Sequence, residues 1–165
     1  MKVFNASPEL TRLRHLSYHL KYGNLAHKKF DFEVYSTHNR EVNICDSAGC
    51  ALGECPGLFP VSWSWHHNNI PGIDILNSDG YKESLSSKES AVHFFGLSRA
   101  EAGHLFYPGE QDKYLAGYPY LKGSSTREEV GHHLELFIES NNTVLKRLIN
   151  NVMFKVANFF RKVIQ

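Results

Sequence analysis

The sequence lacks an apolar run long enough to cross a membrane, because charged residues interrupt every hydrophobic stretch well short of about 18 residues. The N-terminal stretch also lacks the apolar centre of a signal peptide, since Arg12 and Arg14 interrupt it. Three cysteines are too few for a disulfide framework in a chain of 165 residues. These absences favour the cytoplasm, where thiols stay reduced, as the expected location.

A strong net charge is absent as well. The 18 basic and 17 acidic residues leave a net charge of +1, which argues against an overall basic nucleic-acid-binding protein. Disorder is not indicated either, because 42% of the residues are hydrophobic and 13% are aromatic. This length and composition fit one domain that buries a hydrophobic core.

Local signals predict several helices. Ser7 is a suitable N-cap, Pro8 fits the first helical position, and Gly23 is a plausible end. The pair Thr126 and Glu129 forms a capping box before another helical pattern. In the first of these helices the leucines recur at helical spacing, at Leu10, Leu13, Leu16 and Leu20. In the second, apolar residues recur at the same spacing, at Val130, Leu134, Phe137 and Ile138.

The stretch from residue 88 to 110 predicts a helix-turn-helix. Gly96 ends one helix, and Ser98 with Glu101 forms a capping box for the next. Acidic residues balance the basic ones here, and that balance repels a phosphate backbone. Sequence-specific DNA binding is therefore not expected.

The middle of the chain favours extended structure. The sequence VSWSW alternates with a period of two, and glycine and proline supply turns between residues 71 and 80. Together these patterns predict a mainly α-helical fold, with residues 1–142 as a single compact helical domain and a small β-hairpin or extended element in its middle.

The cysteines Cys45, Cys50 and Cys55 are spaced five residues apart in ICDSAGCALGECPG. With His66 or His67 they offer a candidate zinc site, although structural zinc sites usually use closer pairs. A reactive thiol is a second interpretation. A third interpretation, which we favour, is a short helix over residues 48–54, ended by Pro56 and Gly57, whose small side chains let aromatic rings pack closely while the thiols serve as small buried hydrophobes.

The segments CDSAGCALG and AVHFFGLSRAEAGHLFYP, preceded by KFDFEVYST, resemble a family of small uncharacterised bacterial and phage proteins. Members of that family carry a motif similar to CGTAGCAIG, followed by FFGLS and then by EA and LF. This chain departs from the motif at Asp46 and Ser47. The resemblance implies an accessory protein of bacterial or phage kind, and it implies no reaction.

Histidines and tryptophans provide other candidate residues. Trp63, Trp65, His66 and His67 fall in an expected loop and form a candidate binding surface. His15 and His19, four residues apart, are interpreted as polar residues on a helix surface. His132 and His133 are adjacent and therefore point in different directions, so one of them is expected at the edge of the core.

The C-terminal segment, residues 143–165, contains five basic residues and no acidic residue, whereas residues 1–139 contain 13 basic and 17 acidic residues. Its apolar residues recur at helical spacing, which predicts a basic amphipathic helix packed on the domain. The alternative is a helix that binds an anionic membrane surface or a partner. The expected interaction face includes Lys146, Arg147, Lys155, Phe159, Phe160, Arg161 and Lys162.

The sequence therefore favours a non-enzymatic protein-interaction module, with a protein as its partner and without a cofactor. A zinc- or small-molecule-binding protein that uses the cysteines and His66 or His67 is the alternative. An enzyme with histidines as acid–base groups stays open, because imidazole titrates near neutral pH.

Overall fold

The computed structural model describes residues 7–27, 29–32, 48–66, 70–107 and 121–141. About half of these residues are helical, and the strands are short. The predicted basic helix of residues 143–165 lies outside the described residues, as do Cys45 and His67.

The helices of the described ranges are α1 (Pro8–Tyr22), α2 (Cys55–Leu58), α3 (Ser87–Phe95), α4 (Arg99–Phe106) and α5 (Arg127–Asn141). The strands are β1 (Lys29–Phe30), β2 (Ala48–Gly49), β3 (Ser64–His66), β4 (Ile70–Gly72), β5 (Asp74–Leu76) and β6 (Lys82–Ser84). The first strand pairs with the second in parallel, and β3–β4 and β5–β6 are antiparallel. The fold of the described residues combines helices with small strand pairs, so the expected helical fold with a hairpin in its middle is confirmed in part.

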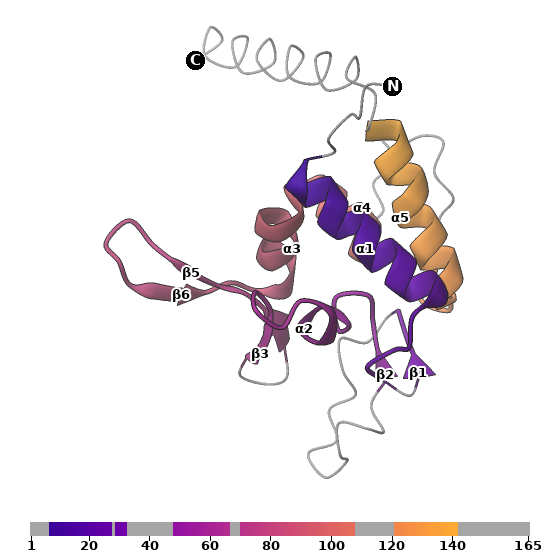
Figure 1. Ribbon diagram of the computed structural model, residues 1–165, viewed down its shortest axis with the longest axis horizontal. Helices are drawn as coiled ribbons and strands as arrows, with labels where there is room; N and C mark the ends of the chain where they lie inside the picture. The colour runs from indigo at the N-terminus through magenta and orange to yellow at the C-terminus, as the bar shows by residue number, and fades with distance from the viewer. Residues whose placement is uncertain (1–6, 28, 33–47, 67–69, 108–120, 142–165) are drawn as a thin grey trace, which may run out of the picture.

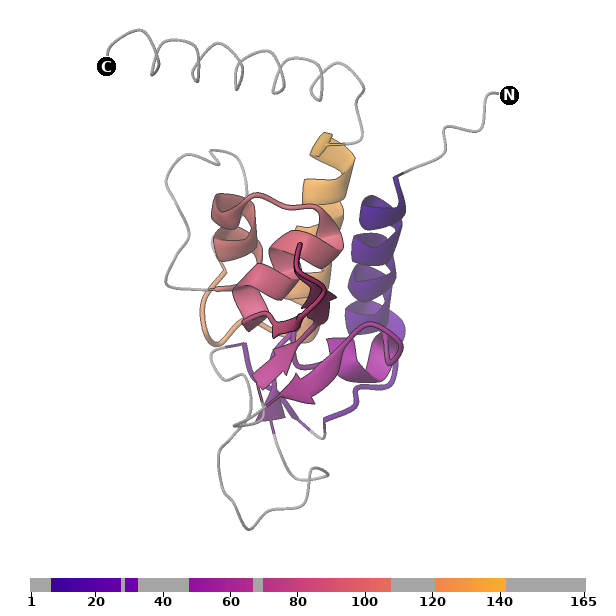
Figure 2. The same ribbon diagram turned by 90° about the vertical axis from the view of Figure 1, so that its left-hand side faces the viewer.

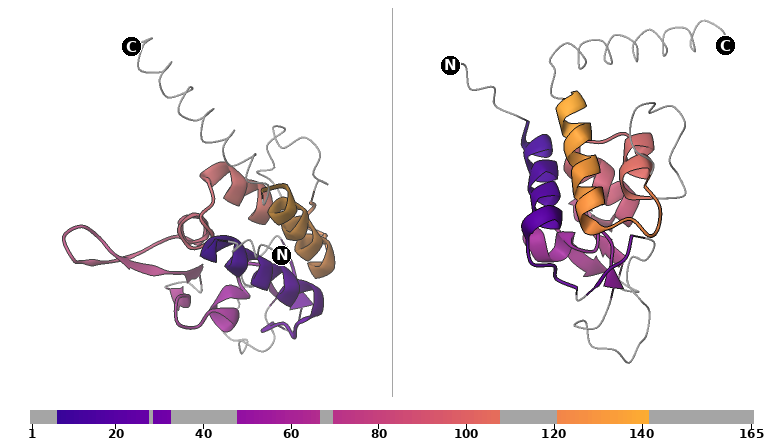
Figure 3. Two further views of the ribbon diagram at one scale, coloured as in Figure 1. Left: turned by 45° about the horizontal axis from the view of Figure 1, so that its top comes forward. Right: turned by 90° about the vertical axis from the view of Figure 1, so that its right-hand side faces the viewer.

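Two halves are visible in the arrangement of these elements. In Figures 1 and 2 the longer helices α1, α3, α4 and α5 form one half, while α2 and the strands β1 to β4 lie below them. Figure 3 shows α1 and α5 side by side. One hydrophobic core joins the halves, because residues of both, such as Leu13, Leu52 and Leu134, are completely buried in it.

Predicted helix ends are confirmed where the signal is local. The Ser7 hydroxyl accepts a hydrogen bond from the Leu10 N–H, and α1 ends at Gly23. Ser98 and Glu101 form both bonds of a capping box at α4, and Gly96 adopts a left-handed conformation with φ of 63° between α3 and α4. The second predicted capping box also forms, since the Thr126 N–H donates to Glu129 Oε2 over 2.8 Å.

The predicted helix over residues 48–54 is wrong. Ala48 and Gly49 form β2, residues 51–54 are turns, and the helix begins at Cys55, so that Pro56 lies inside its first turn. Proline is tolerated there because the N–H it lacks has no partner within a helix. The pairing of Ala48 and Gly49 with Lys29 and Phe30 overrides the local helical preference.

A glycine lets α1 and α5 approach each other. A Cβ atom on Gly131 of α5 would lie 2.7 Å from Lys21 Cγ and 3.0 Å from the Ser17 carbonyl oxygen. The Ser17 hydroxyl donates to the Gly131 carbonyl oxygen over 2.8 Å, in a bond that is buried. Glycine therefore serves close packing here, which offsets its poor helix propensity.

Replacing Gly131 with valine is expected to lower the free energy of unfolding by about 1–3 kcal/mol, because the new methyl groups must push α1 away from α5. Urea denaturation followed by circular dichroism measures this change. His132→Val is the matched control, because the neighbouring side chain is 60% exposed and the same residue type is introduced. Equal stability of the two variants would contradict the close packing at Gly131.

Candidate functional site

The β5–β6 hairpin projects from the body of the molecule, and we call residues 74–84 the arm. Figure 1 shows it extending sideways from β3 and α3. The turn at its tip is made by local signals: Asn77 Oδ1 accepts hydrogen bonds from the N–H groups of Asp79 and Tyr81, and Gly80 adopts a φ of 80°. Glycine is favoured at such a left-handed position because it has no Cβ.

The arm exposes large apolar side chains near its tip. Leu76 is 74% exposed and Tyr81 is 72% exposed. In the antiparallel register Leu76 is opposite Lys82, and the Asn77 N–H donates to the Tyr81 carbonyl oxygen. Directly opposite residues of a hairpin share a face, and successive residues alternate between faces. Leu76 and Tyr81 therefore point to opposite faces of the arm.

Polar contacts fix the base of the arm. The carboxylate of Asp74 accepts a hydrogen bond from the Ser84 hydroxyl over 2.6 Å and pairs with Lys82 Nζ at 2.7 Å. His66 Nε2 of β3 lies 3.3 Å from Asp74 Oδ1. Lys82 and then Ser84 lower the pKa of the Asp74 carboxyl, which keeps it charged at neutral pH. Asp74 thus joins the two strands of the arm to each other and lies beside β3 of the neighbouring hairpin.

The predicted binding surface around the tryptophans is only partly a surface. Trp63 is 2% exposed and packs against Phe94 and Phe95, so its assignment to an exposed surface is wrong. Trp65 and His66 are half-buried. The ring of Trp65 meets the ring of His27 edge-on, with 5.7 Å between centroids. Among the described residues of this predicted surface, His66 lies beside the arm, close to Asp74.

A buried carboxylate that sequence reasoning missed lies behind Trp65. Glu54 is completely buried, and its Oε1 lies 2.8 Å from His27 Nδ1. Its Oε2 lies 3.0 Å from His19 Nε2 and accepts a hydrogen bond from the Ala26 N–H over 2.7 Å. Burial by itself raises the pKa of the Glu54 carboxyl, but these hydrogen bonds outweigh it and bring the pKa to about 2.

The cluster of Glu54, His19 and His27 holds the loop after α1 against residue 54 and does not form an open site. His27 is buried, and a Cβ atom on Gly23 would lie 2.5 Å from the second ring nitrogen of His19, so that nitrogen faces the backbone. The interpretation of His19 as a surface residue is therefore wrong, whereas His15 is exposed. In the sequence, the sign of this cluster is Glu54, an acidic residue within an otherwise small and apolar stretch.

The two described cysteines are free and buried. Burial raises the pKa of the Cys50 thiol to about 11 and that of the Cys55 thiol well above its ordinary value, so both are protonated at neutral pH. The Cys55 thiol points to the Ala51 carbonyl oxygen, 3.7 Å away. These thiols pack as small hydrophobes, as expected, although not on the predicted helix.

The zinc site stays a prediction. Cys45 and His67 fall outside the described residues, and within the described ranges no three His, Cys, Asp or Glu side chains gather in the manner of a metal site. Zinc analysis of the purified chain, before and after Cys50→Ser, tests the prediction.

In a Cys45→Ser background, Cys50 and Cys55 are expected to react with a disulfide reagent at pH 7 at least about 100-fold more slowly in the folded protein than in urea, because they are buried and protonated. The absorbance of the released thiolate measures the rate. An Arg99→Cys variant provides an exposed control thiol, since the Arg99 side chain is 75% exposed. Equally fast labelling of all thiols would contradict the burial.

A pair of buried histidines lies between α4 and α5. The rings of His104 and His133 are 4.9 Å apart between centroids and tilted by 41°. Burial, followed by the neighbouring histidines His104 and His132, lowers the pKa of His133 to about 4, so the ring is neutral at pH 7. The expectation that one of the adjacent histidines His132 and His133 reaches the core is confirmed.

Comparison of the chain with protein-family models, curated proteins and solved structures finds no match. The resemblance to the bacterial and phage family therefore stays a prediction. Within the described ranges, no helix has the length and apolar character that crossing a membrane requires.

Proposed function

We propose that this chain is a non-enzymatic protein-interaction module of the bacterial or phage accessory kind, and that it binds a protein partner through the arm. The observation that supports this proposal is the exposure of Leu76 and Tyr81, at 74% and 72%, on a hairpin that projects from the body. Apolar and aromatic anchors of this kind supply most of the free energy of binding in protein interfaces. In this proposal the module acts in the cytoplasm.

The position of the anchors defines the kind of partner. Because Leu76 and Tyr81 point to opposite faces of the arm, a flat surface can cover only one of them. A cleft that receives the arm covers both, and this is the partner surface we propose. The side chains of β6 are exposed, and Lys82 and Glu83 put charges on that strand. Charges on an edge strand disfavour the addition of a further strand, so side-chain contacts carry the binding.

The base of the arm supports the same function. Asp74 pairs with Lys82 and accepts a hydrogen bond from Ser84, and these contacts hold the two strands of the arm together at its base. An anchor that is already ordered loses less conformational entropy when it binds. His66, a member of the predicted binding surface, lies beside this base, with its Nε2 3.3 Å from Asp74 Oδ1.

Site-specific photo-crosslinking in cells tests the proposal. A photoreactive amino acid at position 81 is expected to give a discrete product with one protein, and Leu76→Lys is expected to abolish that product. The same amino acid at position 99, an exposed site on α4, is the control. With the identified partner, Leu76→Lys and Tyr81→Lys should each raise the Kd at least about tenfold. Products that are equal at positions 81 and 99 would refute the proposal.

A further inference from the structure

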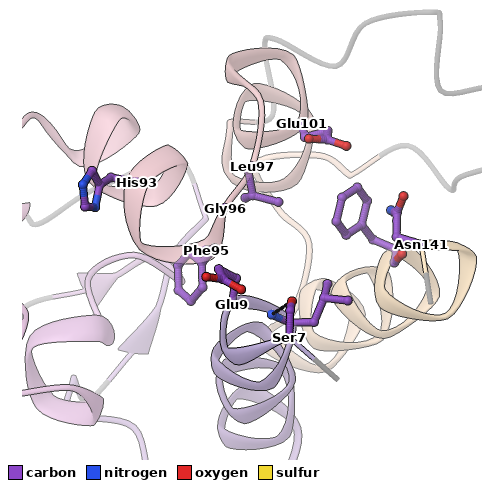
Figure 4. Close-up of a pocket in the computed structure, with 10 residues that line it drawn as sticks. Ser7, Glu9, His93, Phe95, Gly96, Leu97, Glu101 and Asn141 are labelled. Atoms are coloured by element: carbon purple, nitrogen blue, oxygen red, sulfur yellow. Dashed lines mark hydrogen bonds between the residues drawn. The ribbon is translucent and has the colours of Figure 1, made fainter. Parts of the chain in front are cut away.

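A pocket of about 320 Å³ lies where α1, the end of α3, α4 and α5 meet. Leu10, Leu97 and Phe137 are buried apolar residues that line it. Glu9 of α1 and Glu101 of α4 add two carboxylates, which Figure 4 shows together with Asn141 at the end of α5. The pocket thus combines an apolar floor with an acidic rim.

The chemistry of the pocket matches the segment that follows it. Asn141 is the last residue of α5 and lines the pocket, so the chain continues into residues 142–165 directly at the pocket. The first residues of that segment include Leu145, Lys146, Arg147 and Leu148, in which two basic residues stand between two leucines. Four residues span at most about 14 Å, and that length keeps Leu145 close to the rim.

We propose that residues 143–148 dock in this pocket, with Leu145 on the apolar floor and Lys146 and Arg147 facing Glu9 and Glu101. Residues 1–6 also adjoin the pocket through Ser7, but they contain one basic residue, Lys2, whereas the C-terminal segment contains five. The docked segment withholds its basic apolar face from other acidic surfaces.

Hydrogen exchange measured by mass spectrometry on the full chain tests this docking. The amides of residues 143–150 are expected to exchange at least about tenfold more slowly than in a synthetic peptide of residues 139–165. Glu9→Lys, Lys146→Glu and Leu145→Asp should each bring exchange close to the rate of the peptide. Combining Glu9→Lys with Lys146→Glu should restore part of the protection, because the charge pair is re-formed in reverse. Lys155→Glu, farther along the segment, is the matched control.

Three results would overturn the proposal. Exchange of residues 143–150 at the rate of the peptide means that the segment is not docked. Slow exchange that Glu9→Lys and Leu145→Asp leave unchanged means that it docks elsewhere. Protection that appears only when phosphatidylglycerol vesicles are added means that the segment is a membrane anchor. Exchange of the α1 and α5 amides, followed in the same spectra, verifies that each variant stays folded.

Discussion

Glu54→Ala is expected to lower the free energy of unfolding at pH 7 by about 3–5 kcal/mol, because it removes a buried charge from two imidazoles and one backbone N–H. The carboxylate joins the end of α1, through His19, to the following loop, through Ala26 and His27. All three groups lose their acceptor at once. Urea denaturation followed by circular dichroism measures the loss.

The same variant has a predictable pH dependence. The pKa of Glu54 is about 2 in the folded chain and about 4.3 in an unfolded one. The carboxylate therefore stabilises the fold fully above pH 4.3, and this stabilisation is lost as the pH falls towards 2. The difference in stability between the wild type and Glu54→Ala should shrink over that interval.

His133 gives a second pH dependence, at higher pH. The folded chain favours the neutral ring of His133, so the free energy of unfolding falls as the pH drops from about 6.5 to 4.

Two further variants make the Glu54 prediction specific. Glu54→Gln keeps the size and one acceptor oxygen, so its stability should lie between those of the wild type and Glu54→Ala. Glu83→Ala, at an exposed position of β6, should change stability by less than about 0.5 kcal/mol. If Glu54→Ala were as stable as Glu83→Ala, the carboxylate would not hold the chain together.

Trp63→Ala is expected to cost about 3–5 kcal/mol, because it removes a large buried ring from the core. The indole meets the ring of Phe94 edge-on, with 5.7 Å between centroids, and lies 6.2 Å from the Phe95 ring. A cavity of this size fills only partly when the surroundings relax. Differential scanning calorimetry together with urea denaturation measures the loss.

Phenylalanine at the same position is the informative control. The Trp63 Nε1 atom has no hydrogen-bond partner in the part of the chain that the structure describes. Trp63→Phe therefore sacrifices size but no hydrogen bond there, and it should cost less than about 1.5 kcal/mol. Trp65→Ala, at a half-buried position, should cost less than Trp63→Ala. A larger loss of stability in Trp65→Ala than in Trp63→Ala would contradict the assignment of Trp63 to the core.

Local chemistry made several elements predictable. The two capping boxes, the left-handed Gly96 and the leucines of α1 act over a few residues, so the sequence is enough to place these helices. The arm also carried a local signal, since Asp79 and Gly80 predict a turn between extended residues. No local pattern predicts that the arm projects from the body or that Leu76 and Tyr81 are exposed.

Tertiary contacts decided what lies between those elements. The position of residues 48–54 before Pro56 and Gly57 predicts a helix, yet two of these residues pair with residues 29 and 30, far back in the chain. Alternation in VSWSW predicts a strand but does not say which face is covered, so Trp63 was placed on the surface. Histidine spacing on α1 likewise gives no sign that His19 reaches Glu54, 35 residues later.

The sequence alone determined both ends of α1, the end of α3, the starts of α4 and α5, the turn of the arm and the contrast between an acidic body and a basic C-terminal segment. These features depend on neighbouring residues or on composition. Only the tertiary structure decided that the buried Glu54 joins His19, Ala26 and His27, that Trp63 belongs to the core and that Asp74 joins the two strands of the arm. Burial and pairing bring together residues far apart in the chain, and no local pattern encodes which ones meet.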